Sequence, residues 1–304
     1  MRKKVISVLI LFLYLAGVVI FALPDLNSLR HTAAVREVTE TFGEKARGSE
    51  GEPASDLAEL RQQMETYNKE IYEERQAGLT DPWAYESEGV DLTEYGLEEN
   101  VAAVITIPAM DVELPVYLGA TQENMAKGAV QLGQTSMPVG GENTNCVIAA
   151  HRGYRGIPMF RDIELLKPGD EITVENLWET LTYRVTEIRI LYPSDIGEVL
   201  IQDGKDMITL LTCHPYTQHS RRYAVFCERE GQIPDSAKDA SVSWQVREAA
   251  AAEDGEEFET ERLLRKGGYL LLIVTGAAIA GNFCLRRRKQ HGKPGRKRNR
   301  KPTS

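Results

Sequence analysis

The chain has 304 residues and a formal net charge of −9, and 42% of its residues are hydrophobic. Three of its 36 Lys and Arg residues lie in the opening MRKK and ten in the block RRRKQHGKPGRKRNRK near the C-terminus, whereas Asp and Glu number 45. The chain between these basic ends is therefore strongly acidic, which argues against a nucleic-acid-binding protein.

The first predicted element is a membrane span. Residues 5–23, VISVLILFLYLAGVVIFAL, contain no charge. A helix of this length, at about 1.5 Å per residue, crosses a hydrocarbon core. A cleavable signal peptide is the competing interpretation, but its apolar region is usually shorter, and IFALPDL offers no small-residue cleavage site. We therefore expect residues 1–24 to form a cytoplasmic start and an uncleaved transmembrane helix.

Residues 25–100 are expected to form an extracellular linker, an amphipathic helix and a loop. The segment TFGEKARGSEGEP is typical of a linker. From Ser55 to Ala77 the apolar residues recur at spacings of three and four, which predicts a helix with one apolar stripe that stops at Gly78. Trp83 lies in the polar loop LTDPWAYESEG, residues 79–89, as a packing anchor or as a cover for a site.

Residues 101–232 show short apolar or β-branched runs separated by turn residues such as PVGGEN, KPGD and QDGKD. This pattern predicts a mainly β domain, either a closed barrel or a sandwich. GAVQL and MFRDIELL are interpreted as short helical pieces. Strands are expected near residues 101–107, 112–118, 145–150, 171–175, 180–191, 206–213 and 222–229.

The remainder is predicted to return the chain to the membrane. Residues 233–266 are acidic and helix-prone and are interpreted as a linker, and residues 267–285, GGYLLLIVTGAAIAGNFCL, as a second transmembrane helix. A buried core helix is the alternative, but the basic tail at 286–304 argues against it. Because basic residues flank the cytoplasmic side of membrane spans, we expect both termini inside and the β domain outside, with the tail near anionic lipid.

The four cysteines are Cys146, Cys213, Cys227 and Cys284. Cys284 falls in the second predicted span, which leaves an odd number outside. Cys146 and Cys227 are interpreted as apolar packing residues, and a disulfide between them is possible only if their strands are neighbours. No CxxC or HExxH spacing is present, so neither a metal site nor a cofactor is expected.

Cys213 ends the apolar strand DMITLLTC, a common place for chemistry. A thiol needs a nearby base or cation to become a thiolate at neutral pH. His151 ends a second apolar strand and is the preferred partner, because His214 would point away from Cys213 on a continuing strand. An arginine would stabilise the oxyanion of an attacked carbonyl, but alternation alone does not choose between Arg221 and Arg222.

TLLTC followed by an arginine nine residues later, with VIAAHRG upstream, resembles the sortase family of cysteine transpeptidases. The longer runs SMPVGGENTNCVIAAHRGY, MFRDIELLKPGDEITV and TLLTCHPYTQHSRRYAV are similar to the class C, pilin-polymerising sortases, as is ITIPAMDVELPVYLGA. The sequence DPW, residues 81–83, resembles the lid of that class. The resemblance covers roughly residues 55–232 and departs from many relatives at His214, where they carry a small or hydroxyl residue.

The resemblance implies a closed sortase-like β-barrel with short helices, an N-terminal helix and a lid, flanked by two transmembrane helices. It assigns Cys213 as the nucleophile, His151 as general acid and then base, and Arg222 rather than Arg221 as the arginine of the site. Asp81 and Trp83 take the positions of the lid residues, with the carboxylate near the arginine and the indole ring over the thiol.

The reaction implied is cleavage of an LPxTG-like sorting signal through a thioester and transfer to an amine. In the pilin class, the amine is a pilin lysine. The partners implied are the membrane and pilin or surface proteins that carry such signals. A housekeeping sortase that attaches proteins to the cell wall, a hydrolysing cysteine peptidase and a non-enzymatic assembly scaffold are the alternatives. A papain-like enzyme is disfavoured, because its cysteine precedes its histidine along the chain.

Overall fold

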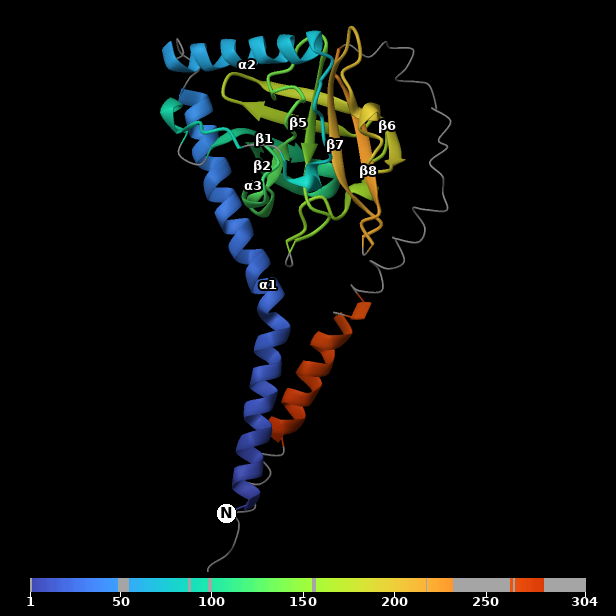
Figure 1. Cartoon of the computed structure of the whole chain (residues 1–304). Coiled ribbons are helices and arrows are strands. Elements are labelled where there is room, and N and C mark those ends of the chain that lie inside the picture. Colours follow the sequence, from blue (N-terminus) through green and yellow to red (C-terminus); the bar gives the residue numbers. More distant parts are fainter. Residues whose placement is uncertain are drawn as a thin grey trace, which may run out of the picture. The chain divides into compact units, whose positions relative to one another are not determined.

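The computed structural model describes residues 2–48, 55–86, 89–97, 100–154, 157–216, 218–231, 263–264 and 266–281 (Figure 1). The chain divides into two compact units, residues 24–251 and the two ends, 1–23 with 252–304. Cys284, the tail at 286–304 and nearly all of the predicted acidic linker lie outside the described residues, so these predictions stay predictions.

The unit formed by the chain ends contains the start of helix α1 (Arg2–Gly48) and an apolar helix at Lys266–Gly281. Among the described residues, only α1 is long and apolar enough to cross a membrane. Within this unit the Tyr14 hydroxyl donates a hydrogen bond to the Leu272 carbonyl at 2.7 Å. The first apolar run is thus helical, as a membrane anchor requires, whereas the span predicted at 267–285 stays a prediction.

A linker was predicted to begin at residue 41, but residues 41–48 are still part of helix α1, so the prediction was wrong for these residues. The helix continues to Gly48, and its second half packs against the β domain through three buried side chains, Val35, Thr39 and Phe42. His31 Nε2 also lies 2.9 Å from the carbonyl oxygen of Lys127. Thr41 and Glu44 of this segment are exposed on a docked helix, which explains why its composition resembles that of a linker.

The β domain is a closed barrel with the strand order β1-β2-β3-β4-β7-β8-β6-β5, which decides between the two predicted architectures (Figure 1). The β2·β3 and β4·β7 pairs are parallel, and the other six are antiparallel. The strands are β1 (Val101–Ile107), β2 (Val112–Leu118), β3 (Ala129–Gln131), β4 (Thr144–Ala149), β5 (Glu171–Asn176), β6 (Thr180–Leu191), β7 (Asp206–His214) and β8 (Arg221–Arg229).

The segment GAVQL was wrongly interpreted as helical, because it contains β3. This strand of three residues joins β2 to β4, and its place in the barrel rather than its own sequence determines its conformation. MFRDIELL contains a single 3-10 turn, η4 (Ile163–Leu165). The other short helices are α3 (Gln122–Lys127), η1 (Pro82–Ala84), η2 (Thr93–Tyr95), η3 (Pro108–Met110) and η5 (Ile196–Val199).

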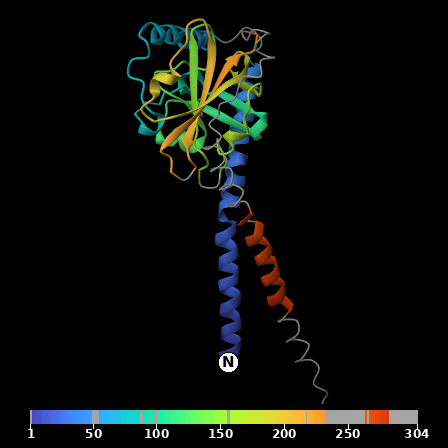
Figure 2. The same cartoon turned by 90° about the vertical axis from the view of Figure 1, so that its right-hand side faces the viewer.

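Helix α2 (Ser55–Glu73) carries the predicted apolar stripe and lies across one end of the barrel in both views (Figures 1 and 2). It ends before the predicted Ala77, because Arg75 and Gln76 adopt left-handed backbone conformations. The Gln76 side chain then donates to the carbonyl of Gln134 and accepts from the backbone N–H of Ile201. Tertiary hydrogen bonds therefore replace the last predicted turn of the helix.

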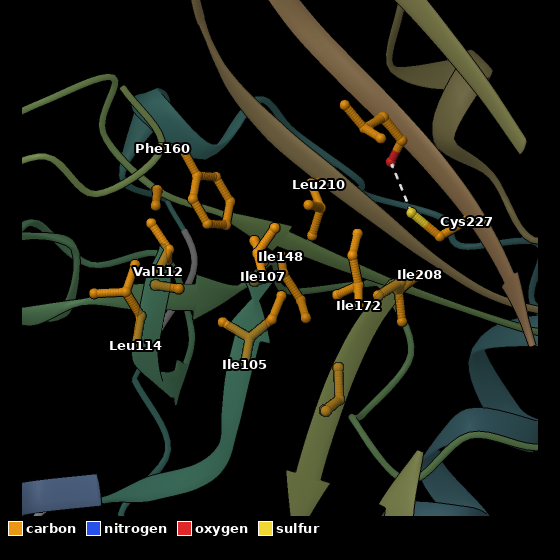
Figure 3. Close-up of a cluster of buried hydrophobic side chains, with 14 of the residues drawn as sticks. Ile105, Ile107, Val112, Leu114, Ile148, Phe160, Ile172, Ile208, Leu210 and Cys227 are labelled. Atoms are coloured by element: carbon orange, nitrogen blue, oxygen red, sulfur yellow. Dashed lines mark hydrogen bonds between the residues drawn. The ribbon is translucent and has the colours of Figure 1, made fainter. Parts of the chain in front are cut away.

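Most strands are buried on both faces, whereas β5 and β6 alternate buried apolar residues with more exposed polar ones. One face of each strand fills the barrel interior, part of which Figure 3 shows around Ile148 and Leu210, and the other face lies under α1, α2 and the loops. Along β7, Ile208 and Leu210 point inward, whereas Met207 and Leu211 belong to the outer cluster. Because successive strand residues alternate, this pattern fixes the directions of the polar residues at the strand ends.

Candidate active site

Cys213 and Arg222 face each other across the β7·β8 pair. They are direct partners in the antiparallel register, and alternation from Leu211 and Ala224 places both on the outer face of the barrel. Their exposed fractions are 6% and 7%. The register therefore separates Arg222 from its neighbour Arg221, which stacks on Tyr192 instead, with 4.8 Å between its guanidinium carbon and the ring centroid.

His151 reaches the same edge from β4. The parallel β4·β7 register ends at Ala149 opposite Leu211, and the backbone N–H of Ala150 still donates to the carbonyl of Leu211 at 3.2 Å. One residue further on, His151 lies on the outer face, level with Cys213. Two residues from distant parts of the sequence are thus brought to neighbouring strand ends, as the strand-end pattern suggested.

The segment DPW covers this edge. Asp81 is the N-cap of η1, where its carboxylate accepts the Trp83 backbone N–H at 3.2 Å. The same carboxylate accepts two hydrogen bonds from Arg222, from Nε at 2.6 Å and from Nη2 at 2.7 Å. The Arg222 guanidinium carbon also lies 4.5 Å from the centroid of the Trp83 ring. Two-point contacts of this kind between arginine and a carboxylate are strong, because both hydrogen bonds are charge-assisted.

His151 contacts two aromatic side chains, Trp83 and Tyr154. The Trp83 indole N–H donates to Nδ1 of His151 at 3.4 Å, and the Tyr154 ring stacks on the imidazole with 4.9 Å between the centroids and an interplanar angle of 12°. Sequence analysis did not identify Tyr154. It lies three residues after His151, but only the fold of the intervening turn brings its ring back over the imidazole.

The covered site holds its thiol protonated. Burial raises the pKa of Cys213 to about 11, and the Asp81 carboxylate adds to the rise, whereas Arg222 and Arg152 oppose it. Burial also lowers the pKa of His151, as does the positive charge that His219 can carry nearby. Near pH 7 the closed arrangement therefore contains a neutral thiol and a neutral imidazole, rather than a thiolate and an imidazolium.

The residues that follow His151 and Cys213 point the other way. Arg152 and His214 lie on the inward side of the barrel end, each 2% exposed. The expectation that the His214 side chain diverges from Cys213 is therefore confirmed, since β7 continues through His214. Sequence analysis did not identify Arg152 as part of this region, although its position next to His151 and the strand alternation contained the signal.

Cys146 and Cys227 point into the barrel interior on either side of β7, where both pair with Ile208. Their strands are not neighbours, so their Cα atoms are about 10 Å apart by the usual strand spacing, which is too far for a disulfide. Burial raises the pKa of both thiols. The prediction that both are packing residues fits this placement.

No three His, Cys, Asp or Glu side chains among the described residues are grouped so as to hold a metal ion. The site consists of a thiol, an imidazole, a guanidinium and a two-residue cover. Such a set can perform nucleophilic acyl transfer, with the guanidinium as a ready donor for a negatively charged oxygen.

Comparison with known proteins agrees with this chemistry. Residues 105–230 match the model of the sortase domain. Sortase A of Bacillus anthracis is 34% identical over 128 residues, which are 42% of this chain and 59% of that protein. Sortase A of Staphylococcus aureus is 33% identical over 124 residues, 40% of this chain and 59% of that protein. The matched region thus spans about three fifths of each of these curated relatives.

Solved structures extend the match. Sortase C2 of Pilus Island 1 from Group B Streptococcus is 34% identical with a TM-score of 0.53, and the match covers 60% of this chain and 99% of that one. Sortase C-1 from Actinomyces oris is 34% identical with a TM-score of 0.52, again over 60% and 99% of the two chains. The fold of these proteins matches that of this chain, which belongs to the sortase family. The class C resemblance of its sequence is matched by these neighbours.

Proposed function

We propose that this chain is a membrane-anchored class C sortase that joins proteins covalently by way of Cys213. The observation that carries the proposal is the meeting of Cys213, His151 and Arg222 at one barrel edge beneath Asp81 and Trp83. The Group B Streptococcus and A. oris neighbours are sortases C, and the streptococcal one belongs to a pilus island. We therefore infer that the substrates here are pilin or surface proteins.

In the proposed reaction, Cys213 gives its proton to His151, and its sulfur attacks the carbonyl carbon of the threonine in an LPxTG-like signal. Arg222 donates hydrogen bonds to the oxygen that becomes negative. The C–N bond then breaks as His151 returns the proton to the departing amine, leaving a thioester on Cys213. A lysine amine of the next subunit loses a proton to His151, attacks the thioester and releases the thiol.

Asp81 and Trp83 are proposed to act as a lid. In the closed state the Asp81 carboxylate occupies the two Arg222 donors that the reaction needs, and the Trp83 ring covers the same edge. The signal peptide would take the place of both side chains. The lid would therefore lower resting activity and reserve the thiol for substrates that can displace it.

The proposed location is the cell membrane, with α1 as the anchor, the Lys266–Gly281 region as the core of a second span and both termini in the cytoplasm. The barrel then faces outward, where sorting substrates are tethered to the same membrane. Tethering enzyme and substrate in one membrane raises their effective concentration. This arrangement suits an enzyme that must join one anchored protein to another.

The test uses the full chain in membrane vesicles with a fluorescent LPxTG-like peptide, with and without an added amine. We expect an amine-dependent product and a covalent intermediate on Cys213, both absent in Cys213→Ala. The matched control is Cys227→Ala, which removes a buried thiol, costs about 1–2 kcal/mol of stability and keeps activity.

Other outcomes point to other functions. Cleavage that ignores the amine would indicate a peptidase. In cells, wall-linked monomers instead of ladders would indicate a housekeeping sortase. Polymers that persist in Cys213→Ala would indicate a scaffold and end the proposal.

A further inference from the structure

A buried ion-pair cluster lies directly beneath the proposed active site. Its centre is Arg152, which is 2% exposed and points into the barrel end, opposite to His151. A charge at such a position is costly unless its hydrogen bonds are met by well-placed partners. The partners that Arg152 has therefore indicate what this arginine does.

The Arg152 guanidinium contacts two other segments of the chain. Its Nη1 lies 2.7 Å from Nδ1 of His214 and donates to the backbone carbonyl of Cys213 at 3.4 Å. Its Nη2 forms an ion pair with the carboxylate of Glu164 in η4. Because arginine has no acceptor, Nδ1 of His214 must be the acceptor in this contact.

These contacts couple the two strand ends that carry the reacting groups. Arg152 is the chain neighbour of His151, and it bonds to the backbone of Cys213 itself. The β4·β7 ladder ends at Ala149, and the Thr212 hydroxyl donates to the Ala150 carbonyl at 2.7 Å just beyond it. Beyond that bond, Arg152 connects the ends of β4 and β7 through the carbonyl of Cys213, next to the reacting side chains.

Arg152 also places a permanent positive charge close to Cys213. It lowers the pKa of this thiol, against the larger effect of burial and against Asp81. Glu164 neutralises part of the Arg152 charge, since the two form an ion pair. Other titratable or charged groups also face Cys213 or the Arg152 cluster. They are Asp81 and Tyr85 around η1, His151 after β4, Glu164 in η4, and Arg222 and Tyr223 in β8.

We propose that Arg152 is a positioning residue: it holds Cys213 level with His151, and its buried charge favours the thiolate. This inference rests on the proposed roles of those two residues. Arg222 acts from the outer face, and in the closed state its guanidinium donates two hydrogen bonds to the Asp81 carboxylate. Arg152 acts from the inner face, and its partners Cys213, His214 and Glu164 do not belong to the lid.

The test measures the pH midpoint of Cys213 alkylation by iodoacetamide in the full chain in detergent, with mass spectrometry of the Cys213 peptide. In Arg152→Met the midpoint should rise by about one pH unit, because a cation near the thiolate is lost. In Glu164→Gln it should fall, because the carboxylate that offsets the Arg152 charge is neutralised. Each variant loses an ion pair, so both should melt at lower temperature.

The opposite signs separate the proposal from a purely structural role, which would move both midpoints the same way. Arg152→Lys is the matched control, because it keeps the charge and should stay nearer to the unmodified chain than Arg152→Met. The proposal is overturned if Arg152→Met leaves the midpoint unchanged or if Glu164→Gln raises it. If Arg152→Met does not fold, the sign in Glu164→Gln decides alone, and an absent or upward shift overturns the proposal.

Peptide cleavage gives a second measurement. Arg152→Lys should lower kcat roughly 10- to 100-fold through misplacement of the reacting groups. KM should change little, because Arg152 lies beneath the site, away from its outer face. An unmodified chain that cleaves no sorting-signal peptide would defeat the proposed function, whereas the alkylation midpoints would still decide the role of Arg152.

Discussion

The single hydrogen bond from Trp83 to His151 determines which form of the imidazole the closed site holds. An indole N–H only donates, so Nδ1 of His151 must accept and the neutral ring carries its proton on Nε2. Burial lowers the pKa of His151 in the same direction. A proton on Nδ1 would break this contact, so the lid and an imidazolium at His151 oppose each other.

Opening the lid should activate the thiol. In Asp81→Ala with Trp83→Ala, the burial that raises the pKa of Cys213 to about 11 is reduced and the Asp81 charge is removed, while Arg222 remains. Both changes lower the pKa, so iodoacetamide alkylation of Cys213 should reach its midpoint at a lower pH and be faster at pH 8. Peptide cleavage should rise with it.

Two single variants separate the contributions of the lid. Trp83→Phe keeps an aromatic cover, so its alkylation midpoint should lie between those of the unmodified chain and the double variant. Asp81→Asn keeps the shape and removes the charge. Unchanged alkylation and cleavage rates in the double variant would show that these residues do not restrain the site.

The residues of the site were predictable from sequence to different degrees. Cys213 and His151 stand out because each ends an apolar strand, and the motif resemblance selected Arg222 where alternation left two arginines open. Arg152 was missed, although its position next to His151 and the strand alternation placed it on the opposite side of β4. Tyr154 could not be found in this way, because its contact with His151 depends on how the turn after β4 folds, and local composition does not carry that fact.

At the scale of elements, the second half of α1 belongs to the fold of the β domain. We expect Phe42→Ala to lower the free energy of unfolding of this domain by about 3–5 kcal/mol, because a buried aromatic ring that packs with the outer cluster is lost. Urea unfolding of the full chain in detergent, followed by fluorescence, measures this change.

Glu44→Ala is the matched control, because Glu44 is exposed on the same helix and its loss should cost less than about 0.5 kcal/mol. Equal effects of the two variants, or no effect of Phe42→Ala, would mean that residues 41–48 behave as the linker that their composition suggests.

Strand content was largely predictable because most strands are long, β-rich runs bounded by turn residues. The strand that was missed, β3, has three residues and exists because β2 and β4 each need a neighbour for the barrel to close. The end of α2 was placed too late, since Gln76 exchanges a helical turn for hydrogen bonds to Gln134 and Ile201. Tertiary demands of this kind leave no periodic signal in the sequence.

At the scale of the whole molecule, the charge distribution predicts two membrane crossings. An epitope inserted near residue 240 should be reached by antibody on intact cells, whereas one after Ser304 should be reached only after permeabilisation. The reason is the basic tail at 286–304, which resists transfer across the membrane. A C-terminal epitope that is accessible on intact cells would mean a single crossing by α1.

The architecture of the catalytic unit followed from the sequence only up to a choice between barrel and sandwich. Strand order is a non-local property: β7 lies between β4 and β8, although two strands and more than 50 residues separate it from β4 along the chain. The motif resemblance supplied the closed barrel, because related sequences share a topology that patterning of single strands does not contain.

The positions of the two interior thiols imply that the barrel must fold before these thiols meet an oxidant. Cys146 and Cys227 are kept apart by the full width of β7. In a newly made, unfolded chain the two sulfurs can meet, and an oxidant could join them in a disulfide before β7 takes its place in the barrel. Such a cross-link would exclude β7, and the nucleophile with it. Barrel closure must therefore outpace oxidation if the enzyme matures outside the cell, and chaperones or reductants that delay oxidation should increase the yield of active protein.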